Sequence, residues 1–300
     1  MLSLTGLRHV YPNGTRALED VSLEIPPGMF GLLGPNGAGK SSLMRCLATL
    51  QVPSAGSIVF DGIDVLREPA TLRATLGYLP QDFGVYPRVS AYDLLDHLAV
   101  LKGIARKGER KASVESLLVQ VNLWNERHKA VAGFSGGMRQ RFGIAQALLG
   151  SPRLVIVDEP TAGLDPEERN RFNDLLTKIA DSVVVILSTH LVEDVADLCP
   201  RMAILVQGRV VCQGAPPDLL HDLEGRVWSR ALDEGDDVAS AKERWNVTSS
   251  RLRAGRSHVR VVATERPDEG FEARPPSLED VYFATLREGR AVAADTNGAT

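Results

Sequence analysis

The 300-residue sequence predicts an α/β protein whose mixed sheet has a mostly parallel core. Apolar runs at 154–157 and 183–187 flank a helical pattern near 166–180. Such continuous runs are typical of parallel strands buried on both faces. A glycine-rich loop at 34–41 stands between a strand pattern and a helix pattern, and helical spacing of apolar residues dominates 86–131. At 300 residues the chain is long enough for one large domain and a smaller one.

The order of these patterns predicts the domain organisation. Residues 2–4 and 18–25 alternate between apolar and polar positions around a turn at Pro12-Asn13-Gly14, which favours an N-terminal antiparallel β subdomain. The α/β patterns then end near Gly214. We expect a main domain over 2–214 with a helical subdomain at about 86–131, a small β-containing accessory segment over 215–290 and a disordered tail over 291–300.

Charge and cysteine content exclude some classes of protein. The formal net charge is −4, so no overall basic field attracts nucleic acid, and we expect no nucleic-acid partner. Cys46, Cys199 and Cys212 are too far apart in sequence for a CxxC pair or a dense disulfide framework, which suits a reducing compartment.

Membrane insertion through this chain is not expected. A membrane-spanning helix needs roughly 20 apolar residues, and the longest aliphatic runs are far shorter. The first residues also lack the basic flank and apolar core of a signal peptide. We expect a cytoplasmic protein that reaches a membrane only through a partner.

The segment 34–41 fits the pattern GxxxxGK[ST] in its required place between a strand and a helix. Glycines let successive backbone N–H groups converge on phosphate oxygens, and the helix dipole adds attraction for the anion. Lys40 is expected to reach the β- and γ-phosphates, and the Ser41 hydroxyl to bind Mg²⁺. A chance glycine turn is the alternative, which the strand–loop–helix context disfavours. The expected ATP-binding residues here are Gly34, Pro35, Asn36, Gly37, Ala38, Gly39, Lys40, Ser41 and Ser42.

Two acids, Asp158 and Glu159, follow the apolar strand at 154–157. Strand ends of this kind are where α/β sheets bind ligands, so Asp158 is a candidate Mg²⁺ ligand and Glu159 a candidate base that orients the attacking water. His190 ends the strand pattern at 183–189 and is expected near the γ-phosphate, where it could hold Glu159's water. The alternatives are a strand that exits into a polar turn and a purely structural histidine.

A second anion-binding helix start is predicted at Ser135-Gly136-Gly137, followed by Met138. Serine is a good N-cap, and the glycines expose backbone N–H groups. Because an inserted helical region separates this turn from the loop at 34–41, one chain cannot easily fold both onto one phosphate. Two copies placed head to tail can do so. A simply capped helix is the alternative.

Together these motifs resemble the ABC ATPase family over residues 2 to about 214, with phenylalanine at 134 where many members have leucine. The resemblance implies ATP and Mg²⁺ as cofactors, a homodimer or a heterodimer with a related ATPase, and an integral-membrane permease partner on the inner face of the cell membrane. It further implies that Gln81 is a Mg²⁺ ligand that senses the permease. Asp165 would couple the two sites across the dimer, and Tyr11 would stack on adenine.

Two weaker resemblances, at 277–282 and at 80–86, favour the branch of drug- and antibiotic-type exporters. The expected cargo is then a drug-like or antibiotic-like small molecule or a lipid. An importer ATPase shares every catalytic motif and stays open. A soluble ABC-type ATPase not involved in transport is disfavoured by the absence of heptad arrays and CxxC pairs. A GTPase switch is disfavoured because Thr177-Lys178 lacks the aspartate that reads guanine.

Overall fold

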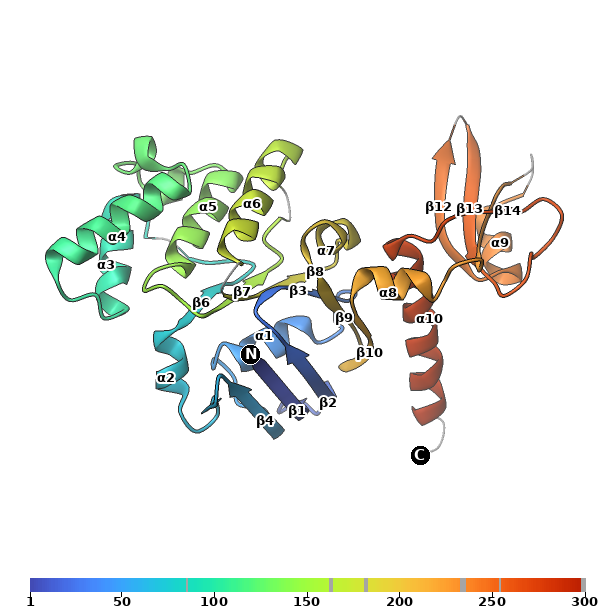
Figure 1. Ribbon diagram of the computed structural model, residues 1–300, viewed down its shortest axis with the longest axis horizontal. Coiled ribbons are helices and arrows are strands. Elements are labelled where there is room, and N and C mark those ends of the chain that lie inside the picture. The colour runs from blue at the N-terminus through green and yellow to red at the C-terminus, as the bar shows by residue number, and fades with distance from the viewer. Residues whose placement is uncertain (85, 162–163, 181–182, 233–235, 254, 298–300) are drawn as a thin grey trace.

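The protein is described here from a computed structural model, which covers all residues except 85, 162–163, 181–182, 233–235, 254 and 298–300. Its central sheet has the order β10-β9-β3-β8-β7-β6 (Figure 1). The pairs β6–β7, β7–β8, β8–β3 and β3–β9 are parallel, and the edge strand β10 pairs antiparallel with β9. This confirms the predicted mixed sheet with a mostly parallel core. The strands are β3 (Gly28–Leu33), β6 (Leu76–Leu79), β7 (Leu154–Asp158), β8 (Val184–Thr189), β9 (Arg201–Val206) and β10 (Arg209–Gly214).

The N-terminal antiparallel sheet also forms as predicted, in the order β2-β1-β4-β5. Its strands are β1 (Leu2–Val10), β2 (Arg16–Ile25), β4 (Ala55–Phe60) and β5 (Ile63–Asp64). The turn between β1 and β2 is closed by hydrogen bonds from the amide of Tyr11 to the carbonyl of Thr15 and from the amide of Gly14 to the carbonyl of Tyr11, at 2.9 Å each. This turn places Tyr11 beside the start of the first helix.

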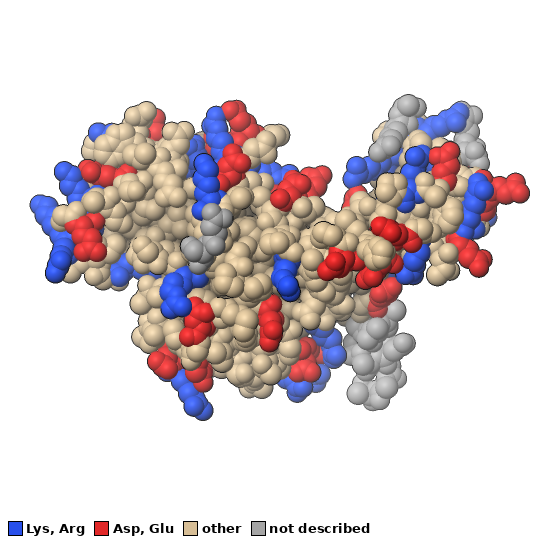
Figure 2. Space-filling model, viewed as in Figure 1, with Lys and Arg blue, Asp and Glu red and all other residues tan. Residues whose placement is uncertain are grey.

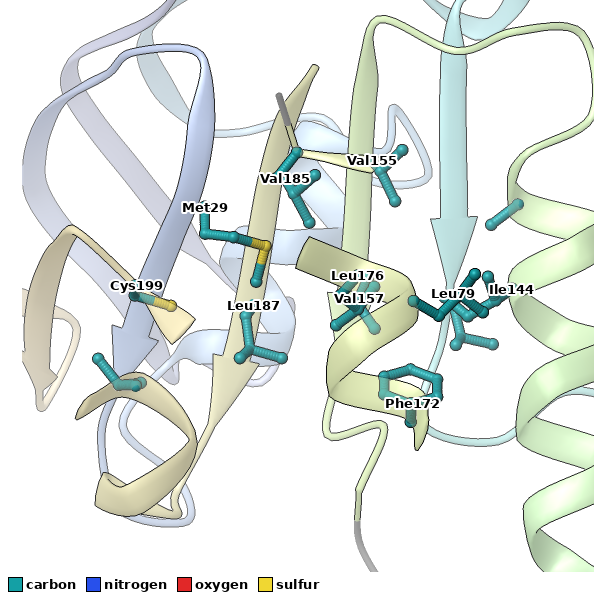
Figure 3. Close-up of a cluster of buried hydrophobic side chains, with 14 of the residues drawn as sticks. Met29, Leu79, Ile144, Val155, Val157, Phe172, Leu176, Val185, Leu187 and Cys199 are labelled. Atoms are coloured by element: carbon teal, nitrogen blue, oxygen red, sulfur yellow. The ribbon is translucent and has the colours of Figure 1, made fainter. Parts of the chain in front are cut away.

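Helices cover both faces of the central sheet (Figure 1). The helices of the described chain are α1 (Lys40–Leu47), α2 (Pro69–Ala74), α3 (Ala91–Leu101), α4 (Lys107–Gln120), α5 (Gly136–Ala147), α6 (Pro166–Ile179), α7 (Val192–Leu198), α8 (Pro216–His221), α9 (Val238–Arg244) and α10 (Leu278–Asn297). Of these, α9 packs on the C-terminal sheet instead of the central one. Because side chains alternate along a strand, β7 and β8 supply two cores. Ile156 and Ile186 pack with the N-terminal sheet and α1. Val157 and Leu187 face the other side, where Figure 3 shows Val157 beside Leu176 of α6 and Leu187 near Met29 of β3.

The predicted helical region consists of α3 and α4, followed by two single turns at Trp124–Glu126 and Val131–Gly133. Ser90 caps α3 by accepting a hydrogen bond from the Asp93 amide at 3.1 Å. The amides of Ala91 and Tyr92 donate to the carbonyls of Lys129 and Arg127, so the insertion returns to its own starting point. It then leads directly into α5.

The C-terminal part contains a separate sheet of order β12-β13-β11-β14. Its strands are β11 (Val227–Ala231), β12 (Val247–Arg253), β13 (Arg256–Val262) and β14 (Glu272–Ala273), with a core that includes Val259, Val261 and Phe271. Helix α10 connects this sheet to the main body, since it contacts α7, α8 and β9. The accessory segment is therefore attached next to the helix that follows His190.

Helix α10 runs to Asn297, and residues 298–300 lie outside the described part of the chain. Among the residues that the structure describes, no helix has the length and apolarity to cross a bilayer. Basic and acidic side chains are interspersed on the face shown in Figure 2.

The sequence motif at 277–282, at the start of α10, contains a buried carboxylate, that of Asp280. Its carboxylate is fully buried and accepts hydrogen bonds from Thr248 Oγ1 at 2.8 Å, Arg260 Nη2 at 2.6 Å and Ser277 Oγ at 2.7 Å. Burial by itself raises the pKa of Asp280, but the hydrogen bonds from Arg260, Ser277 and Thr248 outweigh it and hold the pKa below its ordinary value. The contribution of Asp280 to folding stability is therefore fully present above the pKa of the unfolded state, near 3.8. It is lost as the pH falls from there through the lower pKa of the folded state.

We expect Asp280→Asn to lower the free energy of unfolding at pH 7 by about 3 kcal/mol, because it leaves the Arg260 charge without its buried partner. Denaturant unfolding at pH 7 and at pH 3 measures this, and the gap to the wild type should shrink at the lower pH. Glu279→Gln is the matched control: Glu279 pairs with Arg251 at the surface, so about 0.5 kcal/mol is expected. Equal losses for the two variants would contradict the role of Asp280.

Candidate functional site

The glycine loop joins the end of β3 to the start of α1. Gly37 and Gly39 have φ angles of 80° and 105°, in the left-handed region that favours glycine. A Cβ on Gly34 would stand 2.5 Å from the carbonyl oxygen of Leu205, and one on Gly39 would stand 2.4 Å from that of Ala17. The loop is thus held against β9 and β2 at positions where only glycine fits, and α1 begins with its N-terminus open to the loop.

Lys40 is 5% exposed and folds back over the loop. Its Nζ donates to the carbonyls of Gly34 at 2.7 Å and Pro35 at 3.2 Å, and lies 3.6 Å from Glu159 Oε1. Burial lowers the pKa of Lys40, while the carboxylates of Glu159 and Asp158 act in the opposite direction. The ammonium group is consequently positioned at the loop by backbone carbonyls and is available to an anion seated there.

Asp158 is the last residue of β7 and is 4% exposed. Burial raises the pKa of this carboxyl, and its Oδ1 has no hydrogen-bond partner among the residues that the structure describes. A buried oxygen without a partner is costly unless a ligand satisfies it. Because oxygen is the ligand type that Mg²⁺ prefers, this atom fits a cation held beside the loop.

Glu159 lies next along the chain with a positive φ of 48°, and its amide donates to the Ser188 carbonyl of β8 at 2.8 Å. This tether turns the side chain toward the loop. Oε1 is 3.2 Å from His190 Nδ1, and Oε2 accepts from Gln81 Nε2 at 3.5 Å. Three of the predicted residues, Lys40, Gln81 and His190, therefore surround this one carboxylate.

A cavity of about 490 Å³ contains most of the predicted residues. Tyr11 lies at its edge, where its hydroxyl is 2.9 Å from Ser42 Oγ and its ring meets His9 edge-on at 4.8 Å. These contacts orient the Tyr11 ring. The lining is Tyr11, Thr15, Arg16, Ala17, Pro35, Asn36, Gly37, Gly39, Lys40, Ser41, Ser42, Gln81 and Glu159.

The serine–glycine turn lies at the start of α5, away from this cavity. Ser135 Oγ accepts from the Met138 amide at 3.2 Å, so the predicted cap is present. Ser135 and Gly136 are exposed, whereas Gly137 packs against Glu168, 2.5 Å from where its Cβ would be. Asp165 caps α6 by accepting from the Glu168 amide at 2.9 Å. Among the described residues that line the cavity of the same protomer, neither Asp165 nor the residues Ser135–Met138 occur.

Some site residues were not predicted from the sequence. Thr15, Arg16 and Ala17 line the cavity, and their position directly after the Pro12-Asn13-Gly14 turn was the available signal. Outside this cavity, the structural role of Arg141 of α5 was also not predicted. It lies 3.2 Å from Glu168 Oε2 through Nε and donates to the Asn122 carbonyl at 3.0 Å, so it ties the helical insertion to α5 and α6. A buried arginine in a helix pattern gives no sequence signal of its partners.

A glycine loop between a strand and a helix, with an acid-tipped strand in the same parallel sheet, defines a P-loop nucleoside triphosphatase. The sequence pattern of the ABC transporter family matches residues 18–162. The chain is 35% identical to the daunorubicin/doxorubicin resistance ATP-binding protein DrrA of Streptomyces peucetius, over 94% of this chain and 91% of that protein. It is 34% identical to the Nod factor export ATP-binding protein I of Rhizobium etli, over 88% and 86%.

The solved dimeric structure of MJ0796, a bacterial ABC transporter cassette, superposes with a TM-score of 0.66 at 26% identity, over 72% of this chain and 98% of that one. The chain therefore belongs to the ATP-binding subunits of the ABC transporter family. This confirms the expected ATPase subunit of an ABC transporter.

Proposed function

We propose that this subunit powers the export of a drug-like or antibiotic-like small molecule or a lipid. The observation that carries the proposal is the extent of the similarity to DrrA, which covers 94% of the chain and so includes the C-terminal sheet and the motif around Asp280. The linearmycin resistance ATP-binding protein LnrL of Bacillus subtilis is 33% identical over 75% of the chain. An importer ATPase is the alternative.

In the proposed chemistry, ATP lies along the glycine loop from Gly34 to Ser42. Lys40 binds the β- and γ-phosphates, the amides of the loop bind their oxygens, and Tyr11 stacks on the adenine. Mg²⁺ fits Asp158 Oδ1, the Ser41 hydroxyl and Gln81, and when bound it would neutralise phosphate charge. Glu159 orients the attacking water and accepts its proton, and His190 holds Glu159 in place at 3.2 Å.

We propose that the second half of each site comes from the opposing subunit of a homodimer or of a heterodimer with a related ATPase. Ser135, Gly136, Gly137 and Met138 would present backbone N–H groups to the γ-phosphate, and Asp165 would couple the two sites. The exposure of Ser135 and Gly136 supports this, because an N-terminal helix turn open to solvent is free to meet a partner. The permease would hold the dimer at the inner face of the cell membrane.

The proposed domain assignment is an ATPase domain over 2–214 with its helical subdomain at about 86–131, followed by the accessory segment over 215–290. The hydrogen bond from the Ala91 amide to the Lys129 carbonyl closes the insertion and supports the limits of the helical subdomain. The separate hydrophobic cluster around Val259 and Phe271 supports the accessory segment as a second unit, because a segment with its own core can fold as a unit.

Transport of a fluorescent amphiphilic compound tests the direction of transport. Cells that express this chain together with its membrane permease are expected to retain less of the compound than cells in which Glu159 is replaced by glutamine. Both proteins should also co-purify from detergent-solubilised membranes. Glu159-dependent accumulation of a solute would establish import instead. Recovery of the chain without any hydrophobic partner would contradict the transporter function itself.

A further inference from the structure

A buried carboxylate outside the nucleotide cavity lies at the meeting point of three segments. Asp194 is in the first turn of α7, four residues after His190, and is fully buried. Taking an ionised carboxylate out of water is costly unless its oxygens are paired. Both of its oxygens are paired here, and with partners from two other elements.

The two hydrogen bonds are short and have different donors. Arg169 Nε of α6 donates to Asp194 Oδ1 at 2.7 Å. Thr161 Oγ1, from the segment after β7, donates to Asp194 Oδ2 at 2.7 Å and is itself 4% exposed. The partners lie 25 and 33 residues away in sequence, so the contact fixes tertiary structure rather than a local turn.

Each of the three segments carries a residue of the proposed chemistry. Thr161 follows Glu159 by two residues, and Asp194 follows His190 by four. Arg169 stands one turn after Asp165, the N-cap of α6. A displacement of the segment after β7 or of α7 would change the 3.2 Å separation of Glu159 and His190, and errors of about 1 Å in such geometry cost about 100-fold in rate.

We infer that Asp194 is a positioning residue for ATP hydrolysis, which acts through Thr161 and Arg169 on the Glu159 and His190 loops. This inference rests on the proposed roles of Glu159 and His190. It differs from a purely structural role for Asp194, in which the buried ion pair only holds α6 against α7. A structural role would change thermal stability and ATP affinity in parallel with turnover.

The test is ATPase kinetics of the full-length chain carrying Asp194→Asn or Thr161→Val. Asn keeps the size of the side chain but loses one acceptor and the charge, whereas Val removes only the hydroxyl and leaves the Arg169–Asp194 pair. Both variants are expected to lower kcat by about 10-fold or more while KM for ATP stays within about twofold. Thr161→Ser keeps the hydroxyl and is expected to restore kcat.

Glu193→Gln is the matched control. Glu193 lies beside Asp194 on α7 and approaches the same guanidinium at 3.4 Å, but its side chain is 77% exposed. Its loss should leave kcat unchanged. Unchanged kcat in folded Asp194→Asn and Thr161→Val would overturn the inference, as would parallel losses of kcat, ATP affinity and melting temperature. If Asp194→Asn does not fold, Thr161→Val and Thr161→Ser decide the question.

The roles of Glu159 and His190 are tested separately by their own variants. If Glu159→Gln hydrolysed ATP normally, the proposed chemistry would fail whatever the Asp194 result. If Glu159→Gln were inactive and Thr161→Val fully active, only the positioning role would fail.

Discussion

Replacing Glu159 with glutamine is expected to abolish ATP turnover while ATP binding stays intact. The amide cannot accept the proton of the attacking water, and removing a general base of this kind lowers the rate by about 100- to 10,000-fold. Binding is retained because the loop amides and Lys40 do not depend on this carboxylate. Loss of a negative charge 3.6 Å from Lys40 Nζ should even favour the triphosphate.

Two measurements check this expectation. Phosphate release reports turnover, and size exclusion with Mg·ATP reports dimer formation, which should persist in the variant because the nucleotide is not consumed. Glu115→Gln on the surface of α4 makes the same change of carboxylate to amide and should behave as the wild type. A wild-type hydrolysis rate in Glu159→Gln would remove Glu159 from the chemistry.

Replacing Lys40 with alanine is expected to abolish ATP binding itself. The ammonium group is 5% exposed and already held over the loop by the carbonyls of Gly34 and Pro35, so the protein does not have to order it when the phosphates arrive. Charge-assisted hydrogen bonds are worth up to about 3 kcal/mol each. We therefore expect affinity to fall by about 100-fold or more.

Titration with a fluorescent ATP analogue measures the affinity. Lys111→Ala, at an exposed position of α4, controls for the loss of one positive charge. Circular dichroism checks that the Lys40→Ala variant is folded. Normal nucleotide affinity in a folded Lys40→Ala variant would contradict the assignment of the loop as the phosphate site.

The parts of the fold that the sequence predicted are those encoded by local patterns. The run at 154–157 has no polar residue, and the structure buries Ile156 on one face and Val157 on the other. A strand buried on both faces has to be continuous in this way. The glycine loop is likewise a local motif, because the backbone geometry at Gly37 and Gly39 is tied to residue type.

The parts that could not be predicted depend on contacts between distant residues. Nothing in the local pattern around Asp194 indicates a buried carboxylate, and the motif at 277–282 does not show what Asp280 contacts. Only the folded chain brings Thr161 and Arg169 to the first, and Thr248 and Arg260 to the second. Fully buried carboxylates are rare, so local pattern favours the wrong assignment at both positions.

Cross-linking between subunits tests the composite ATP site most directly. Asn36 of the glycine loop and Ser135 of the serine–glycine turn are both exposed, and cysteines introduced at the two positions can be joined by a short bifunctional maleimide. In the Glu159→Gln background with Mg·ATP, the proposed site predicts a covalent dimer that does not form without nucleotide. Cross-links within single chains, or none at saturating Mg·ATP with the permease present, would contradict it.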